Sequence, residues 1–154
     1  MKAIAVEPRN FDTTYALGEA YRFQSLEGGE NFQELATEAM KWYERGMRLN
    51  PWDGYNYLRY GWCLDWMERQ QESEPYFSKA EALDPNGFFT MAAIGQHYVE
   101  LKDFAAAKPW FLRSLHLEWS DVNPIAWTYI PIVNRKLAEN ATNEFSAKLT
   151  APNK

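Results

Sequence analysis

A short phrase that ends in proline recurs in this sequence, and its spacing constrains the fold more than any other feature. The phrase occupies residues 5–8, 48–51 and 82–85. The second and third prolines are 34 residues apart, whereas the first and second are 43 apart, which is nine more. Proline cannot continue a helix, so it ends one unit and starts the next turn. A period of 34 residues is typical of helical hairpins stacked in a row.

Small and bulky residues also recur at fixed positions within each period. We number from the third residue after each proline and allow for the nine extra residues of the first unit. Position 8 is then always glycine, positions 20 and 27 are always small, and position 24 is always aromatic. A glycine inside a helix costs about 1 kcal/mol relative to alanine, so its recurrence indicates that two helices approach closely. The residues are Gly18, Gly61 and Gly95; Ala39, Ser73 and Ala107; Gly46, Ala80 and Ser114; and Tyr43, Phe77 and Phe111.

This pattern resembles the tetratricopeptide repeat (TPR) family, which has W-x2-L-G-x2-Y in the first helix, A-x3-F in the second, and a closing proline. The tryptophan of that pattern is replaced by Thr14, Tyr57 and Met91. The resemblance implies an all-α fold, a right-handed α-α superhelix (TPR solenoid). It would contain three helical hairpins and a C-terminal capping helix.

The repeat spacing divides the chain into six segments. An insertion with Gly28-Gly29 as its turn is expected to be a lengthened surface loop, or else a contact loop beside the binding groove. Asn123 and Pro124 are expected to start the last helix. The chain's first residues fit the end of a repeat whose beginning is absent, which indicates a piece of a longer protein. The segments are the end of a preceding repeat (1–10), the first repeat with its insertion (11–53), the second (54–87), the third (88–121), the capping helix (122–140) and a polar tail (141–154).

Composition and charge narrow both the class of protein and the kinds of partner. Hydrophobic residues make up 46% of the chain, too many for a disordered segment. A net charge of −5 and the lack of a basic run argue against nucleic acid and against an anionic membrane surface. The longest apolar stretch, residues 125–133, is too short to insert into a membrane. Cys63 is the single cysteine and is expected to be a buried thiol, so it carries no information on the cellular compartment.

The TPR resemblance also implies a binding site. In that family, positions 2, 5, 9, 12 and 13 of the first helices face a concave groove, so a protein or peptide partner is expected there. Tyr55, Trp62 and Trp66 place three large rings on one helix face, and such rings are favoured anchors. Alternatively, these rings pack against a neighbouring repeat or a second copy, or stack on a carbohydrate. The candidate groove residues are Tyr15, Glu19, Arg22, Tyr55, Leu58, Arg59, Trp62, Asp65, Trp66, Phe89, Ala92 and Gln96.

The sequence lacks the motifs that mark other classes of binding domain and of enzyme. TPR domains that clamp a chaperone's C-terminal carboxylates use Lys at position 5 and Asn at position 9. Here position 5 is Tyr15, Leu58 or Ala92, and Arg59 at position 6 is the one partial match. His97 and His116 have no metal-ligand spacing, and the chain has no phosphate loop or nucleophile elbow. The sequence therefore predicts a chain that is no enzyme and holds no cofactor or metal.

Four phrases point to a narrower resemblance. They are residues 57–66, 83–89, 108–111 and 123–126. Together they resemble the C-terminal TPR region that follows the membrane portion of some bacterial O-antigen ligase or polymerase-like proteins. This resemblance implies a non-catalytic accessory domain attached to a parent membrane protein.

Overall fold

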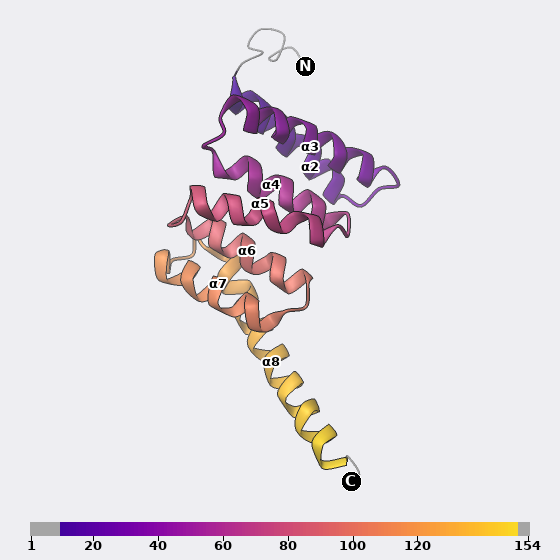
Figure 1. The fold of residues 1–154 in the computed structure, drawn as a ribbon, viewed down its shortest axis with the longest axis vertical. Coiled ribbons are helices and arrows are strands. Elements are labelled where there is room, and N and C mark those ends of the chain that lie inside the picture. Colours follow the sequence, from indigo (N-terminus) through magenta and orange to yellow (C-terminus); the bar gives the residue numbers. More distant parts are fainter. Residues whose placement is uncertain (1–9, 151–154) are drawn as a thin grey trace. The chain divides into compact units, whose positions relative to one another are not determined.

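The structure is a computed structural model that describes residues 10–150. Within this range all regular secondary structure is helical (Figure 1). This confirms the all-α fold expected from the repeat pattern. The predicted end of a preceding repeat lies outside the described residues, apart from Asn10. The helices are α2 (Phe11–Leu26), α3 (Phe32–Leu49), α4 (Gly54–Trp66), α5 (Gln70–Leu83), α6 (Phe88–Glu100), α7 (Phe104–Leu117) and α8 (Pro124–Thr150).

Consecutive helices form three antiparallel hairpins, α2–α3, α4–α5 and α6–α7, as Figure 1 shows. The chain divides into two compact units at residues 85 and 86. The first unit contains the first two hairpins, with α3 also packed against α4. The second unit contains the third hairpin and α8, which packs against both α6 and α7.

Each hairpin is closed by the same contact between a glycine and an aromatic ring. A Cβ atom added at the position 8 glycine would lie 2.5 to 3.1 Å from the ring at position 24, closer than ordinary van der Waals contact. The three rings are at most 1% exposed. The helices can therefore approach only because the glycine has no side chain, as the spacing predicted. The pairs are Gly18 with Tyr43, Gly61 with Phe77 and Gly95 with Phe111.

The insertion in the first hairpin is mostly helical. The expectation that it forms a lengthened surface loop is therefore wrong. Helix α2 has 16 residues against 13 in α4, and α3 has 18 against 14 in α5. Gly28 does lie in the turn, with φ of +73°. Proline and glycine are absent from residues 19–27 and 30–45, so nothing stops either helix before the turn. The Ser25 hydroxyl donates to the Arg22 carbonyl at 2.7 Å within the added turn.

The turns of the second and third hairpins share one backbone conformation. Glu68 and Lys102 both lie in the left-handed region, with φ of 60° and 59°. The N–H that follows each donates back to the preceding helix, Arg69 to the Leu64 carbonyl and Asp103 to the Tyr98 carbonyl, both at 2.9 Å. This six-to-one hydrogen bond is the Schellman motif, which usually has glycine at the left-handed residue. Here two charged residues occupy that position.

Helix α8 completes the core of the second unit. Ala126 and Val133 from α8 are fully buried in one cluster with Ala92, Ala107 and Phe111. The helix begins at Pro124, as the sequence predicted, but continues through Thr150 instead of ending near residue 140. After Pro131 the next proline is Pro152, so no residue interrupts the helix in between.

Cys63 is buried in the first unit, in a cluster with Tyr43 and Leu64. Burial raises the pKa of its thiol to about 12. The side chain is therefore a neutral thiol in the core, as the sequence predicted.

Candidate functional site

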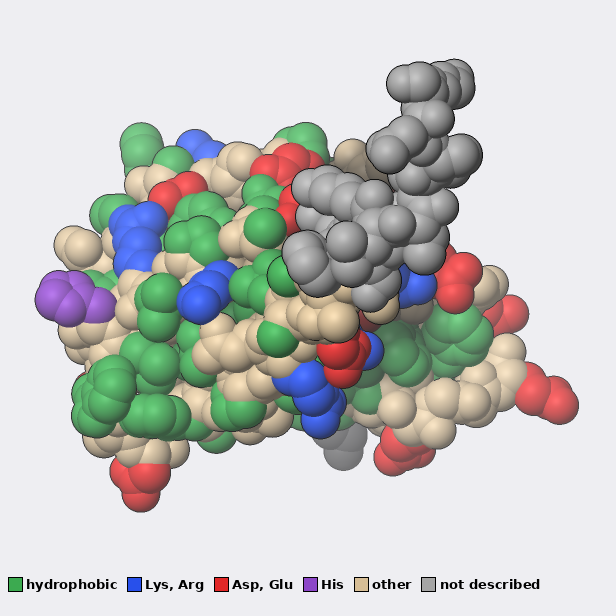
Figure 2. Space-filling view, turned by 90° about the horizontal axis from the view of Figure 1, so that it is seen from below, with side chains coloured by type: hydrophobic (Ala, Val, Ile, Leu, Met, Phe, Trp, Pro, Cys, Tyr) green, Lys and Arg blue, Asp and Glu red, His purple; other side chains and the backbone are tan. Residues whose placement is uncertain are grey.

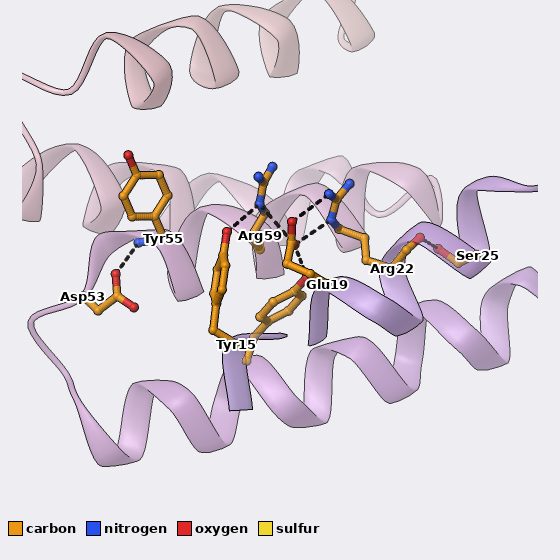
Figure 3. A network of polar contacts seen from close by, with 8 residues as sticks. Tyr15, Glu19, Arg22, Ser25, Asp53, Tyr55 and Arg59 are labelled. Carbon is orange, nitrogen blue, oxygen red and sulfur yellow. Dashed lines mark hydrogen bonds and ion pairs between the residues drawn. The ribbon is translucent and has the colours of Figure 1, made fainter. Parts of the chain in front are cut away.

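Predicted groove residues from α2 and α4 meet in one polar network around Glu19 (Figure 3). Arg22 donates to both carboxylate oxygens, from Nε at 2.8 Å and from a terminal nitrogen at 2.9 Å. The Tyr43 hydroxyl donates to Glu19 Oε1 at 2.5 Å. Arg59 Nε lies 3.2 Å from the same oxygen and also donates to the Tyr15 hydroxyl at 3.2 Å. One carboxylate thus holds side chains from three helices.

The network is largely shielded from water. The side chains of Glu19, Arg22 and Arg59 are 15%, 10% and 11% exposed. Burial raises the pKa of the Glu19 carboxyl, but the hydrogen bonds from Arg22 and Tyr43 and the charge of Arg59 outweigh it. The resulting pKa lies below its ordinary value. Glu19 is therefore ionised at neutral pH and fixes both guanidinium groups in place.

Trp62 on α4 lies under both arginines. The Arg59 guanidinium carbon is 4.6 Å from the centre of its ring, and that of Arg22 is 5.7 Å away. These distances are within the range of a cation–π interaction. Trp62 is half-buried beside these two charged groups, whereas Tyr55 and Trp66 on the same helix are 41% and 40% exposed. The three rings predicted for one face have different surroundings.

An acidic hollow lies where α4 begins. It has a volume of about 500 Å³. Asp53 is the N-cap of α4, since its carboxylate accepts the Tyr55 N–H at 3.0 Å and the Asn56 side-chain amide at 2.6 Å. Asn50 and Asp53 were missed as site residues, although the Asn-Pro-x-Asp run before a helical stretch is a visible capping signal. The residues lining the hollow are Asp12, Tyr15, Asn50, Asp53 and Tyr55.

Apolar side chains are exposed where α2 and α4 end. Phe23 is 59% exposed, and the Arg22 guanidinium carbon lies 4.5 Å from the centre of its ring. Trp66 packs edge-on against Phe32 of α3, with ring centres 5.7 Å apart. We define the α2–α4 face as the row from the acidic hollow, through the Glu19 network, to these rings. Its residues are Asp12, Tyr15, Glu19, Arg22, Phe23, Asp53, Tyr55, Arg59, Trp62 and Trp66.

Two predicted residues on α4 belong to the core instead. Leu58 is fully buried. Asp65 is 9% exposed and accepts a hydrogen bond from the Ser73 hydroxyl of α5 at 2.6 Å, so it holds the second hairpin together. A partner cannot contact these side chains without opening the fold.

In the third hairpin, the predicted groove residues are engaged with the chain itself. Ala92 is 1% exposed and belongs to the core cluster that includes α8 residues. Gln96 donates to the Tyr129 hydroxyl of α8 at 3.2 Å. Phe89 is half-buried. The structure therefore brings most of the candidate residues of the first two hairpins together, except Leu58 and Asp65. In the third hairpin, Ala92 and Gln96 contact α8 instead.

The described residues hold neither a metal-binding cluster nor a membrane-spanning helix. Residues 10–150 contain no group of three His, Cys, Asp or Glu side chains that could hold a metal ion. His97 is buried and His116 is exposed. None of the described helices is both long and apolar enough to span a bilayer. On the face shown in Figure 2, lysine and arginine side chains are scattered among acidic and hydrophobic ones.

Known structures share this fold. No family model and no curated protein matches the sequence. A thermophilic TPR protein of Thermus thermophilus is 17% identical, with a TM-score of 0.77, over 86% of this chain and 68% of that one. The first TPR domain of human RPAP3 is 18% identical, with a TM-score of 0.64, over 82% and 96% of the two chains. The first TPR of Spaghetti (RPAP3), bound to the HSP90 peptide SRMEEVD, is 18% identical, with a TM-score of 0.62, over 80% and 98%. These similarities show that the chain has the TPR fold.

Proposed function

We propose that this TPR-fold chain is a protein-interaction scaffold that binds a peptide or protein segment along the α2–α4 face. The observation that supports this most is the exposure of large rings beside a rigid polar network. Phe23, Tyr55 and Trp66 are between 40% and 59% exposed. Aromatic side chains bury much area at low entropic cost when a partner covers them, which is why they dominate binding hot spots.

The face is preorganised for binding. Arg22 and Arg59 are held by Glu19, and their guanidinium groups lie near the Trp62 ring. Ordering of long side chains is a major cost of association, and here folding has already ordered them. Binding energy from the exposed rings is therefore not offset by freezing the two arginines.

The charges along the face indicate what the partner looks like. Asp12 and Asp53 lie at one end, and Phe23 and Trp66 at the other. We infer a segment with a basic residue at the acidic hollow and an apolar residue beside Trp66. The RPAP3-type structure is bound to an HSP90 peptide, which supports a peptide ligand for this fold. The carboxylate of Glu19 at position 9 argues against a ligand that ends in a free carboxylate at that point.

A peptide display selection tests this proposal. Random peptides are selected on the wild-type chain, and the affinity of the best binders is measured by calorimetry. Tyr55→Ala combined with Trp66→Ala should weaken them by at least about tenfold, because each lost anchor removes about 1–2 kcal/mol. Trp52→Ala is the matched control, since Trp52 is 77% exposed but lies outside the face.

The selection also has outcomes that reject the proposal. Binders that ignore the double substitution, or that are lost equally in Trp52→Ala, would place the binding surface elsewhere. Light scattering of the unliganded chain addresses the alternative of self-association. Concentration-dependent assembly that Tyr55→Ala and Trp66→Ala abolish would identify a second copy as the occupant.

We further propose that the chain serves as an accessory domain of a bacterial membrane protein that handles cell-envelope polysaccharide. The support is the resemblance of residues 57–66, 83–89, 108–111 and 123–126 to the region that follows the membrane portion of O-antigen ligase or polymerase-like proteins. The reading frame that encodes the chain tests this. Membrane helices encoded upstream in the same frame are expected, and a short frame without them rejects the proposal.

A further inference from the structure

Two tryptophans form an open corner in the second unit. Trp119 follows α7 and is 68% exposed, and Trp127 in the first turn of α8 is 39% exposed. Their ring centres are 4.7 Å apart and their planes meet at 78°. With Asp121, Pro124 and Thr128 they line a hollow of about 540 Å³. The repeat pattern assigns no role to these residues.

Hydrogen bonds hold the corner in place. The Trp127 indole N–H donates to the carbonyl oxygens of Trp119 and Ser120, at 3.1 and 3.2 Å. The buried Asn123 amide donates to the Glu118 carbonyl at 2.9 Å, and the Ser120 N–H donates to the Glu118 carboxylate at 2.9 Å. The loop that carries Trp119 is therefore fixed to itself and to α8. Because the Trp127 N–H is already used, that ring offers a ligand mainly its π face.

The charge at the corner is negative. Asp121 is exposed, and no hydrogen bond or ion pair of its carboxylate is found among the described residues. Glu118 contributes a second carboxylate to the same loop. The N-terminus of α8 opposes them with only about half a positive charge. The full negative charge of Asp121, which lines the hollow, outweighs the half charge of the helix dipole, so the hollow favours a cation over an anion.

The angle between the rings decides which neutral or cationic group fits. A sugar stacks its flat face on one ring or on parallel rings, so two rings at right angles cannot both stack on it. A compact cation touches two perpendicular π faces at once, as in aromatic cages for quaternary ammonium groups. We propose that Trp119, Asp121 and Trp127 form a binding site for an organic cation, an alkylammonium or guanidinium group. The cation lies against both rings and pairs with the Asp121 carboxylate.

Calorimetric titration of the full chain with tetramethylammonium chloride and with methylguanidinium chloride tests the site. An uncharged molecule of similar shape, tert-butanol, is the control ligand. Saturable binding of the cations without binding of tert-butanol is expected. Trp119→Ala should weaken cation binding about tenfold, and Asp121→Asn about threefold. Trp52→Ala, which changes a tryptophan of the first unit that is 77% exposed, should leave cation binding unchanged.

Two further arms identify the source of the cation. Tighter binding of capped trimethyl-lysine or arginine amides than of choline would indicate a side chain of a partner protein, and the reverse order a free small molecule. Equal affinity for tert-butanol, or binding of methyl glucoside in place of the cations, would overturn the proposal. So would cation binding that survives both substitutions. Asp121→Asn preserves the size and shape of an exposed side chain, so it gives an answer even if Trp119→Ala perturbs the loop.

Discussion

The first helices of the first unit and of the second unit use the same repeat positions in different ways. In the first unit, position 9 supplies Glu19 and Trp62 to a charged network bordered by exposed rings. In the second unit, Gln96 at that position bonds to Tyr129 of α8. Position 5 supplies Tyr15 to the network in the first hairpin, whereas Leu58 in the second hairpin and Ala92 in the third are buried. A repeat position thus predicts where a side chain points, but not whether the chain itself covers it.

In the second unit, α8 covers the first helix of the third hairpin. Helix α8 packs onto α6 and α7 through apolar residues, and Tyr129 stacks on Phe111 with ring centres 5.5 Å apart and planes at 6°. In the second unit, a helix of the same chain therefore covers the residues that would face a groove. The α2–α4 face, with its rings exposed, is the counterpart that we propose for an external partner.

The largest effect is expected when α8 is detached from the second unit. Val133→Asp places an unpaired charge at a fully buried position and should cost about 4 kcal/mol of the free energy of unfolding. Asn134→Asp adds the same charge on the exposed side of α8 and is the control. Denaturant unfolding and hydrogen exchange of the α8 amides measure both. If the two variants are equally stable, α8 is not held through Val133.

In the first unit, loss of the central carboxylate should be nearly as costly. Glu19→Gln leaves Arg22 and Arg59 largely buried without their anion, and should lower the free energy of unfolding by about 2–3 kcal/mol. Glu38→Gln breaks an exposed ion pair with Lys41 and should change little. Denaturant titrations at pH 7 compare the two. A similar, small loss in both variants would show that the network contributes nothing beyond a surface ion pair.

The contribution of Glu19 to the free energy of unfolding should also depend on pH, with a sign that follows from its pKa. The pKa of Glu19 is lowered in the folded chain, so its stabilising contribution is present above the ordinary carboxyl pKa and is lost as pH falls through the folded pKa. The stability difference between wild type and Glu19→Gln should therefore be constant near neutral pH and shrink below about pH 4. Unfolding curves from pH 7 to pH 2 measure it. A difference that is independent of pH would exclude an ionised Glu19 as its source.

The helix contacts of the two hairpins in the first unit can be compared by adding a single methyl group to each. A Cβ on Gly18 would lie 2.5 Å from the Tyr43 ring, which its hydrogen bond to Glu19 holds in place. Gly18→Ala should cost about 2 kcal/mol, because overpacking outweighs the gain in helix propensity. Gly61→Ala should cost less, since its Cβ would lie 3.1 Å from the Phe77 ring. Thermal unfolding of each variant checks the order, and the reverse order would contradict this packing.

The smallest effects are expected at the turns, equally in both units. Glu68→Gly and Lys102→Gly relieve a left-handed backbone, and each should raise the free energy of unfolding by about 0.5–1 kcal/mol. Lys79→Gly, on an exposed side of α5, should lower it by a similar amount. Denaturant midpoints give all three values. Destabilisation by the turn variants would mean that the charged side chains have a role that the backbone does not reveal.

The repeat spacing predicted the hairpins because helix packing is encoded locally. A glycine at position 8 and a ring at position 24 meet within one hairpin, so Gly18 and Tyr43 could be paired from sequence. The ends of the helices were harder to predict from the sequence. Gly28 located the turn in the first hairpin, but the residues on either side are compatible with both loop and helix, and packing decides between them.

The candidate site was only partly predictable for a similar reason. Leu58 and Ala92 occupy positions that face a groove in the TPR pattern, yet both are buried. Burial depends on segments distant in sequence, which no positional rule includes. The corner of Trp119 and Trp127 was not predicted, because it lies where the repeat pattern ends and depends on how α8 begins.

The lengthened first hairpin has a consequence for rotation about the helix axes. Each residue turns a helix by about 100°, so the three added residues of α2 fall about 60° short of a full turn, and the four of α3 exceed one by about 40°. The two helices turn about separate, antiparallel axes, so these rotations do not offset each other. Tyr43 nevertheless still packs against Gly18, because all nine extra residues lie between them, on the turn side of this contact. The hairpin therefore grows by about 5 Å in length while its repeated spacing of small and aromatic residues still brings the same sides of the helices together.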